Sequence, residues 1–183
     1  METFTHPRTF EENSHFIDQR SLSLRSFDFS AIDPPVVDIV VNFSKLTYCF
    51  TLQICCGHFL YKGQTNPHNL DPLPSNAEIQ EVEYRIAYIV LCLADNNQGR
   101  ALFDDLGRIP LLDPEYIQFG SADWFWERQI NSYALQVEPA RLMFQDSVKV
   151  DYQEAQHLDK VRRDFFSEIR LLLQKRLEIN PSV

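Results

Sequence analysis

The run Cys55-Cys56-Gly57-His58 contains the residues of this chain that are best suited to chemistry. Thiols and imidazoles bind metal ions or take part in covalent catalysis near neutral pH. Cys56 and His58 lie two residues apart in a strand-like segment, which places their Cα atoms about 6.6 Å apart on one face. If Gly57 forms a β-bulge, the facing reverses and Cys55 takes the place of Cys56 beside His58.

Three interpretations of this run are open. In the first, the imidazolium of His58 stabilises a cysteine thiolate that acts as the reagent. In the second, thiol and imidazole bind zinc together with Glu138 and leave a coordination position open for water or substrate. In the third, both side chains only pack in the core. The four cysteines lack the paired C-x-x-C spacing of a structural zinc site, so we assign no metal ligands and leave the cofactor unknown.

Polar residues on two predicted strands, 48–61 and 131–138, offer a second constellation. Each segment alternates apolar and polar residues, which is typical of a strand with one buried face. If the two strands are neighbours, their polar faces form the floor of a cleft, although a half-solvated sheet face has the same pattern. The catalytic candidates are Cys55, Cys56, His58 and Glu138, and the ligand-binding candidates on the strands are Gln53, Ser132 and Gln136.

Aromatic and loop residues complete the list of candidates. Trp124 and Trp126 flank Phe125 in the richest aromatic cluster, which would line an apolar pocket, anchor a partner or fill the end of the core. His68 lies in the proline-rich loop 62–75, and such loops often close over a binding site.

The hydrophobic periodicity predicts an α+β fold with a mainly antiparallel sheet and helices packed on one face. We expect residues 1–35 to form an N-terminal arm that packs on a single α+β domain, 36–183. A capping box at Ser75-x-x-Glu78 and an apolar stripe at helical spacing predict the helix 76–94. The other predicted helices are 98–106, 152–178 and one within 10–20, and the predicted strands are 36–43, 48–61, 116–119, 131–138 and 147–152.

Composition excludes several classes of function. The net charge of −9 disfavours nucleic-acid binding, and the five glycines form neither of the common phosphate-binding motifs. The longest apolar run, 86–94, is too short to cross a bilayer, and residues 1–6 do not resemble a secretory signal. We therefore expect a cytoplasmic protein with reduced cysteines and no membrane partner.

Two classes of function remain. The first is a small-molecule-binding or enzymatic site built from the Cys-Cys-Gly-His turn and the polar faces of neighbouring strands, and this is the one we favour. The second is a non-catalytic interaction subunit that uses the aromatic patch. The 23 aromatic residues and the amphipathic C-terminal helix also predict a homodimer.

Overall fold

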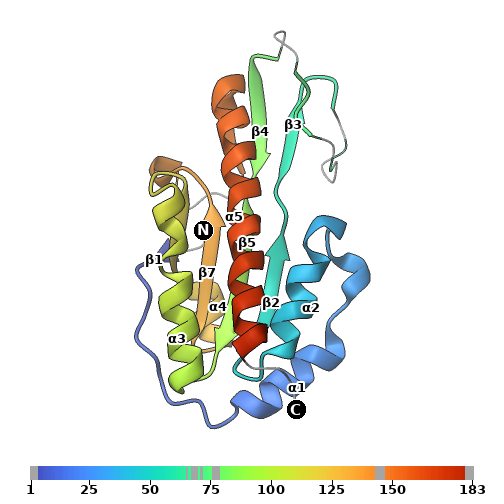
Figure 1. Cartoon of the computed structure of the whole chain (residues 1–183). Coiled ribbons are helices and arrows are strands. Elements are labelled where there is room, and N and C mark those ends of the chain that lie inside the picture. Colours follow the sequence, from blue (N-terminus) through green and yellow to red (C-terminus); the bar gives the residue numbers. More distant parts are fainter. Residues whose placement is uncertain are drawn as a thin grey trace.

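Two antiparallel sheets joined by one long hairpin form the framework of the protein, with helices packed against them (Figure 1). The computed structural model describes residues 4–64, 66, 70, 72–75, 79–142 and 147–179. Within these residues the strands are β1 (Phe4–Thr5), β2 (Cys49–Cys55), β3 (His58–Tyr61), β4 (Glu81–Arg85), β5 (Ala87–Leu93), β6 (Ile117–Ala122), β7 (Ser132–Val137) and β8 (Ser147–Asp151). The α-helices are α1 (Phe16–Ser26), α2 (Val37–Lys45), α3 (Asn97–Leu106), α4 (Asp123–Arg128) and α5 (Tyr152–Ile179), and the 3₁₀ turns are η1 (Phe29–Ala31), η2 (Pro34–Val36), η3 (Ile109–Leu112) and η4 (Ala140–Leu142).

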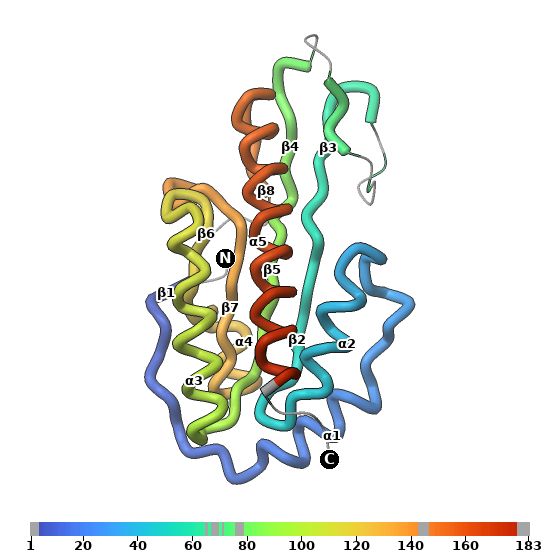
Figure 2. The backbone as a smooth tube through the Cα atoms, viewed as in Figure 1, coloured from blue at the N-terminus to red at the C-terminus, as the bar shows by residue number. Residues whose placement is uncertain are grey.

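One hairpin belongs to both sheets. Its first side runs through β2 and β3, and its second side returns through β4 and β5, as the tube in Figure 2 shows. The β2–β5 half lies in a five-stranded sheet of order β1-β6-β7-β5-β2, and the β3–β4 half lies in a three-stranded sheet of order β3-β4-β8. The α+β fold with antiparallel sheets is therefore confirmed.

Helix α5 covers the framework. It crosses in front of the five-stranded sheet, between α3 and α2 (Figure 1). Its apolar residues recur at helical spacing, and Leu158, Phe165, Ile169 and Leu173 are buried, as the sequence predicted for 152–178. The predictions of strands at 131–138 and 147–152 and of a helix at 98–106 are also confirmed.

The helix predicted over 76–94 is wrong, because residues 81–85 and 87–93 form β4 and β5. Strand β5 lies between β2 and β7 and is buried on both faces. A strand with two buried faces has a continuous apolar sequence instead of an alternating one, and periodicity cannot separate it from a buried helix. The β-branched residues Ile89 and Val90 within this run were the better indication of a strand.

The strand predicted over 36–43 is also wrong, because this segment lies in η2 and α2. Two consecutive prolines would favour an extended chain before a strand, but Pro34 and Pro35 do not form one here. They form the first turn of η2, where proline's fixed φ suits a helical start. The residues that α2 and its preceding turn bury follow the helical i, i+3, i+4, i+7 spacing: Val36, Ile39, Val40 and Phe43.

The first side of the hairpin breaks at Cys56-Gly57, between β2 and β3, and the second side breaks at Ile86. Backbone groups that lose ladder partners inside a protein need other hydrogen bonds. The N–H of Ala87 donates to the hydroxyl of Tyr84 at 2.9 Å, so a side chain replaces the missing partner on the second side. Gly57 has φ +80°, and its Cα lies against Ala87.

The outer edge of β2 is covered by α1. Arg20 of this helix donates from Nε to the carbonyl of Cys49 at 3.1 Å, and from a terminal nitrogen to the carbonyls of Ser44 and Leu46. Phe16 is buried against Phe50. Such a cover prevents the edge from pairing with another chain.

Replacement of Gly57 by alanine tests how closely the break is packed. A left-handed φ costs an L-residue about 1–2 kcal/mol, and a Cβ on Gly57 would lie 2.9 Å from the Cβ of Ala87. Gly63 is the matched control, because it has φ +94° and no described atom lies within 4 Å of an added Cβ. We expect urea unfolding to show a loss of about 2–4 kcal/mol for Gly57→Ala and about 1 kcal/mol for Gly63→Ala. Equal losses would contradict a close approach at the break.

Cys92 of β5 should make the protein less stable at alkaline pH. Burial raises the pKa of its thiol from an ordinary 9.0 to about 12. Above pH 9 the unfolded chain releases this proton while the folded chain retains it, so the free energy of unfolding falls by about 1.4 kcal/mol per pH unit. Cys92→Ala lacks this contribution. Denaturant unfolding from pH 8 to pH 11 should show the stability gap between wild type and variant narrowing, and parallel pH profiles would contradict the assignment.

Candidate functional site

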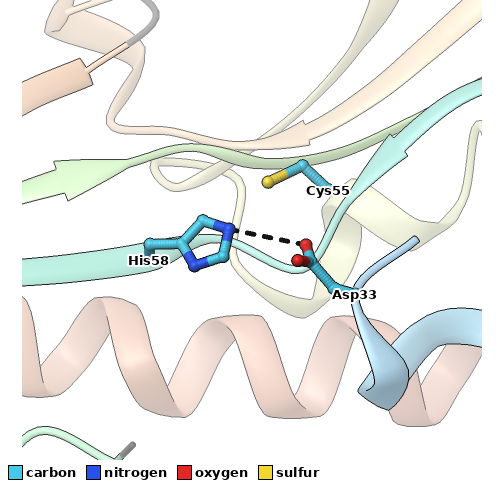
Figure 3. A group of neighbouring side chains, drawn as sticks. All are labelled: Asp33, Cys55 and His58. Atoms are coloured by element: carbon cyan, nitrogen blue, oxygen red, sulfur yellow. Dashed lines mark ion pairs between the residues drawn. The ribbon is translucent and has the colours of Figure 1, made fainter. Parts of the chain in front are cut away.

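Asp33, Cys55 and His58 form a compact cluster at the break of the hairpin (Figure 3). One ligand atom from each residue lies within 4.8 Å of the other two. Cys55 ends β2, His58 begins β3, and Asp33 directly precedes the 3₁₀ turn η2. The three side chains point toward one another from three separate segments (Figure 3).

Asp33 holds the cluster together because one carboxylate oxygen has two neighbours. Its Oδ2 accepts a hydrogen bond from the backbone N–H of Cys56 at 2.9 Å, and it lies 3.4 Å from Nε2 of His58. The imidazole of His58 is buried, while the side chain of Asp33 keeps 21% of its area exposed. The carboxylate therefore fixes the break and approaches the imidazole at the same time.

Arg162 of α5 holds the same turn through its carbonyl groups. A terminal guanidinium nitrogen donates to the carbonyl of Gly57 at 2.7 Å and more weakly to that of Cys56 at 3.4 Å. The other terminal nitrogen donates to Asp159 at 2.6 Å, and the guanidinium lies over the ring of Phe59. A planar group with five donors can satisfy several acceptors at once, which an ammonium cannot do in this geometry.

The structure brings Cys55, and not Cys56, to His58. The register of β2 against β5 shifts between Thr51 and Gln53, and the strand then breaks at Gly57. The expectation that Cys56 and His58 share a face therefore fails, and the arrangement expected after an irregularity at Gly57 is the one found. The buried thiol of Cys56 donates to the carbonyl of Gly57 at 3.5 Å and also interacts with the carboxylate of Asp33, but it is not part of the three-residue cluster.

The electrostatic surroundings keep both thiols protonated. Burial is the main cause that raises the pKa of Cys55 from 9.0 to about 11, with an opposing effect of the Gly57 N–H and a further raising effect of the Asp33 carboxylate included in that value. Burial raises the pKa of Cys56 even more, with a second contribution from Asp33. A thiol is a nucleophile only as the thiolate. At neutral pH these surroundings therefore do not favour the thiolate mechanism for either cysteine.

The residues predicted on the strand at 131–138 do not join the cluster. Strand β5 lies between β2 and β7, so the two predicted strands are not neighbours. Tyr88 of β5 pairs with Cys55 on one side and with Gln136 on the other, and it therefore lies between them. Glu138 is buried just beyond β7 and accepts a hydrogen bond from Gln136 at 2.8 Å. Ser132 is buried at the opposite end of β7, and Gln53 is exposed on β2. The predicted polar cleft is therefore not formed.

The aromatic and loop candidates also lie apart from the cluster. Trp126 is buried against Tyr133 and fills the core, whereas Trp124 is half exposed and is covered by the guanidinium of Arg128 at 4.0 Å. His68 lies outside the described residues.

Asp33 is the site residue that sequence reasoning missed. It lies 23 residues before Cys56, in a segment that carries no motif. The available signal was its place directly before two prolines, where an aspartate is typical of the start of a helical turn, although its side chain does not cap that turn.

Comparison with known proteins leaves the cluster as the main guide to function. No family model, no curated protein and no solved structure matches the chain. Among the described residues, no helix combines the length and the apolar character that a membrane crossing requires.

Thiol labelling of the native protein tests whether the thiols of Cys55 and Cys56 are protonated at neutral pH. Raising a thiol pKa from 9 to about 11 lowers the thiolate fraction at pH 7 about 100-fold. We expect Cys55 and Cys56 to react with a disulfide reagent at least about 100-fold more slowly than a free thiol, and to react fully once urea unfolds the chain. Cys55→Ser and Cys56→Ser identify which thiol any native reaction comes from. Rapid labelling that Cys55→Ser abolishes would contradict the assignment and favour a thiolate mechanism.

Proposed function

We propose that the protein is a metal-binding protein, in which Asp33, Cys55 and His58 hold one divalent ion of the zinc type. The observation that carries the proposal is the convergence of a carboxylate, a thiol and an imidazole within 4.8 Å. A thiol–imidazole–carboxylate set suits zinc, whereas magnesium and calcium prefer oxygen ligands alone.

The distances within the cluster support this assignment. With bond lengths near 2.0–2.3 Å, the ligand atoms around a tetrahedral zinc ion lie about 3.4–3.7 Å from one another. The separation between Nε2 of His58 and Oδ2 of Asp33 is already 3.4 Å. The sulfur of Cys55 needs to approach by about 1 Å at most, which a change of its side-chain torsion can provide.

Three protein ligands leave one position of a tetrahedral ion for water or a small molecule, which is the arrangement of catalytic and not of structural zinc sites. Asp33 and Cys55 are both partly exposed, so a ligand from solvent can reach that position. A zinc ion bound there would lower the pKa of a bound water to near 7. The residues themselves supply the binding set and its orientation, because Asp33 is fixed by the N–H of Cys56.

Metal titration with single-residue variants tests the proposal. Protein stripped with EDTA should bind one Zn²⁺ per chain in competition with a chromophoric chelator, and Co²⁺ should give thiolate-to-metal charge-transfer absorbance. Cys55→Ser and His58→Gln should weaken binding by more than the roughly 10–100-fold that loss of an outer-shell partner causes. Zn²⁺ should also raise the melting temperature, because the ion binds only the folded chain.

Cys56→Ser is the matched control, since it removes the adjacent thiol while Asp33, Cys55 and His58 are all retained, and serine keeps a hydroxyl that can still bond to Asp33. This variant should bind Zn²⁺ as the wild type does and retain the charge-transfer band. Circular dichroism of each variant shows that it has folded. The proposal is wrong if the wild type binds no Zn²⁺ at micromolar concentration, or if Cys56→Ser loses as much affinity as Cys55→Ser.

A further inference from the structure

A second feature lies beside the Cys56–Gly57 turn: a cavity of about 330 Å³ between the chain at Pro35 and helix α5. This volume lies at the lower end of the range that small-molecule sites occupy. Its wall includes three arginines of α5 together with Pro35, Cys56 and Phe166. The chain has a net charge of −9, so a cavity with three arginines in its wall is a local concentration of positive charge in an acidic protein.

The three arginines face the cavity because of helical spacing. Arg163 and Arg170 are seven residues apart and so lie on one face of α5, with Phe166 between them and Arg162 beside them. In the sequence, the basic residues from 160 to 176 are interleaved with acidic ones, a pattern that is typical of a solvated helix face. The structure differs at Arg162, whose side chain is only 16% exposed because it binds the Cys56–Gly57 turn.

Carboxylates neutralise only part of this charge. Asp159 accepts from Arg162 at 2.6 Å and from Arg163 at 2.8 Å, and Asp38 accepts two hydrogen bonds from Arg170. In the ion pairs recorded among the described residues, these three guanidinium groups therefore share two carboxylates.

Arg163 is the arginine with donors to spare. Its side chain is 64% exposed, and within the described part of the chain its recorded partner is Asp159 alone, through one nitrogen. Guanidinium groups bind carboxylate and phosphate through two parallel hydrogen bonds. Phe166 and Cys56 are buried and give the cavity an apolar side.

We propose that this cavity binds a small organic anion, with its carboxylate or phosphate on Arg163 and its apolar body against Phe166. The charge requires an anionic group, and the volume and apolar side require a compact hydrophobic body. The inference concerns a cavity separate from the Asp33–Cys55–His58 set, and it holds whether or not a metal binds there.

Isothermal titration with four probes tests this proposal: benzoate, phenyl phosphate, inorganic phosphate and benzyl alcohol. The two organic anions should bind, inorganic phosphate should bind at least tenfold more weakly than phenyl phosphate, and benzyl alcohol should not bind measurably. Arg163→Gln should weaken binding of benzoate and phenyl phosphate at least tenfold. Lys160→Gln is the matched control, because it removes the same charge from an exposed side chain of the same helix that does not line the cavity.

Two outcomes would overturn the proposal. Equal losses for Arg163→Gln and Lys160→Gln would mean that the anions respond to general charge, and binding of benzyl alcohol equal to that of benzoate would mean that the arginines play no part. Repeating the titration in EDTA and with Cys55→Ser separates the two sites. Anion binding that persists in EDTA and in Cys55→Ser supports the cavity proposal, even if the metal proposal fails. Anion binding that requires both Zn²⁺ and Cys55 places the anion on the metal and overturns the cavity proposal.

Discussion

The structure depends on the contact between Arg162 and the carbonyl groups of Cys56 and Gly57. At these residues the hairpin passes from the five-stranded sheet to the three-stranded sheet, and its ladder of hydrogen bonds is interrupted. An interrupted ladder inside a protein leaves polar groups that water cannot reach, at a cost of about 1–3 kcal/mol for each group. Arg162 satisfies the carbonyls, and its charge is balanced by the buried carboxylate of Asp159.

The same interruption explains why reactive side chains gather there. The N–H of Cys56 has no strand partner, so the carboxylate of Asp33 accepts its hydrogen bond and is brought beside His58. A continuous strand would place Cys55 and His58, three residues apart, on opposite faces, whereas the turn at Gly57 places both next to Asp33. The cluster is therefore a product of the break, and a regular hairpin of the same sequence would not form it.

The sequence predicted those elements whose pattern has one structural interpretation. The apolar residues of α5 repeat at helical spacing along the helix, and those of β7 alternate, so both were predicted correctly. For β5 and α2 the pattern was ambiguous. The buried strand β5 is apolar at every position and so shows no alternation, whereas the buried strand β7 alternates because Ser132 and Gln136 are polar. In α2, Val37, Ile39, Val41 and Phe43 alternate although the helix buries only Ile39 and Phe43 among them. Tertiary packing decides such segments.

The candidate site was predictable only in part, for a related reason. Cys55 and His58 stand out because they are close in sequence, whereas Asp33 and Arg162 reach them across separations that no local pattern records. Glu138 and Gln136 were chosen on the assumption that two predicted strands pair directly, and the insertion of β5 between them removes that contact. Because Asp33 both satisfies the Cys56 N–H and faces His58, the fold and the proposed metal site share one carboxylate. A bound metal ion would therefore use the Asp33 carboxylate, which the Cys56 N–H already holds in place, and neither strand would need to move.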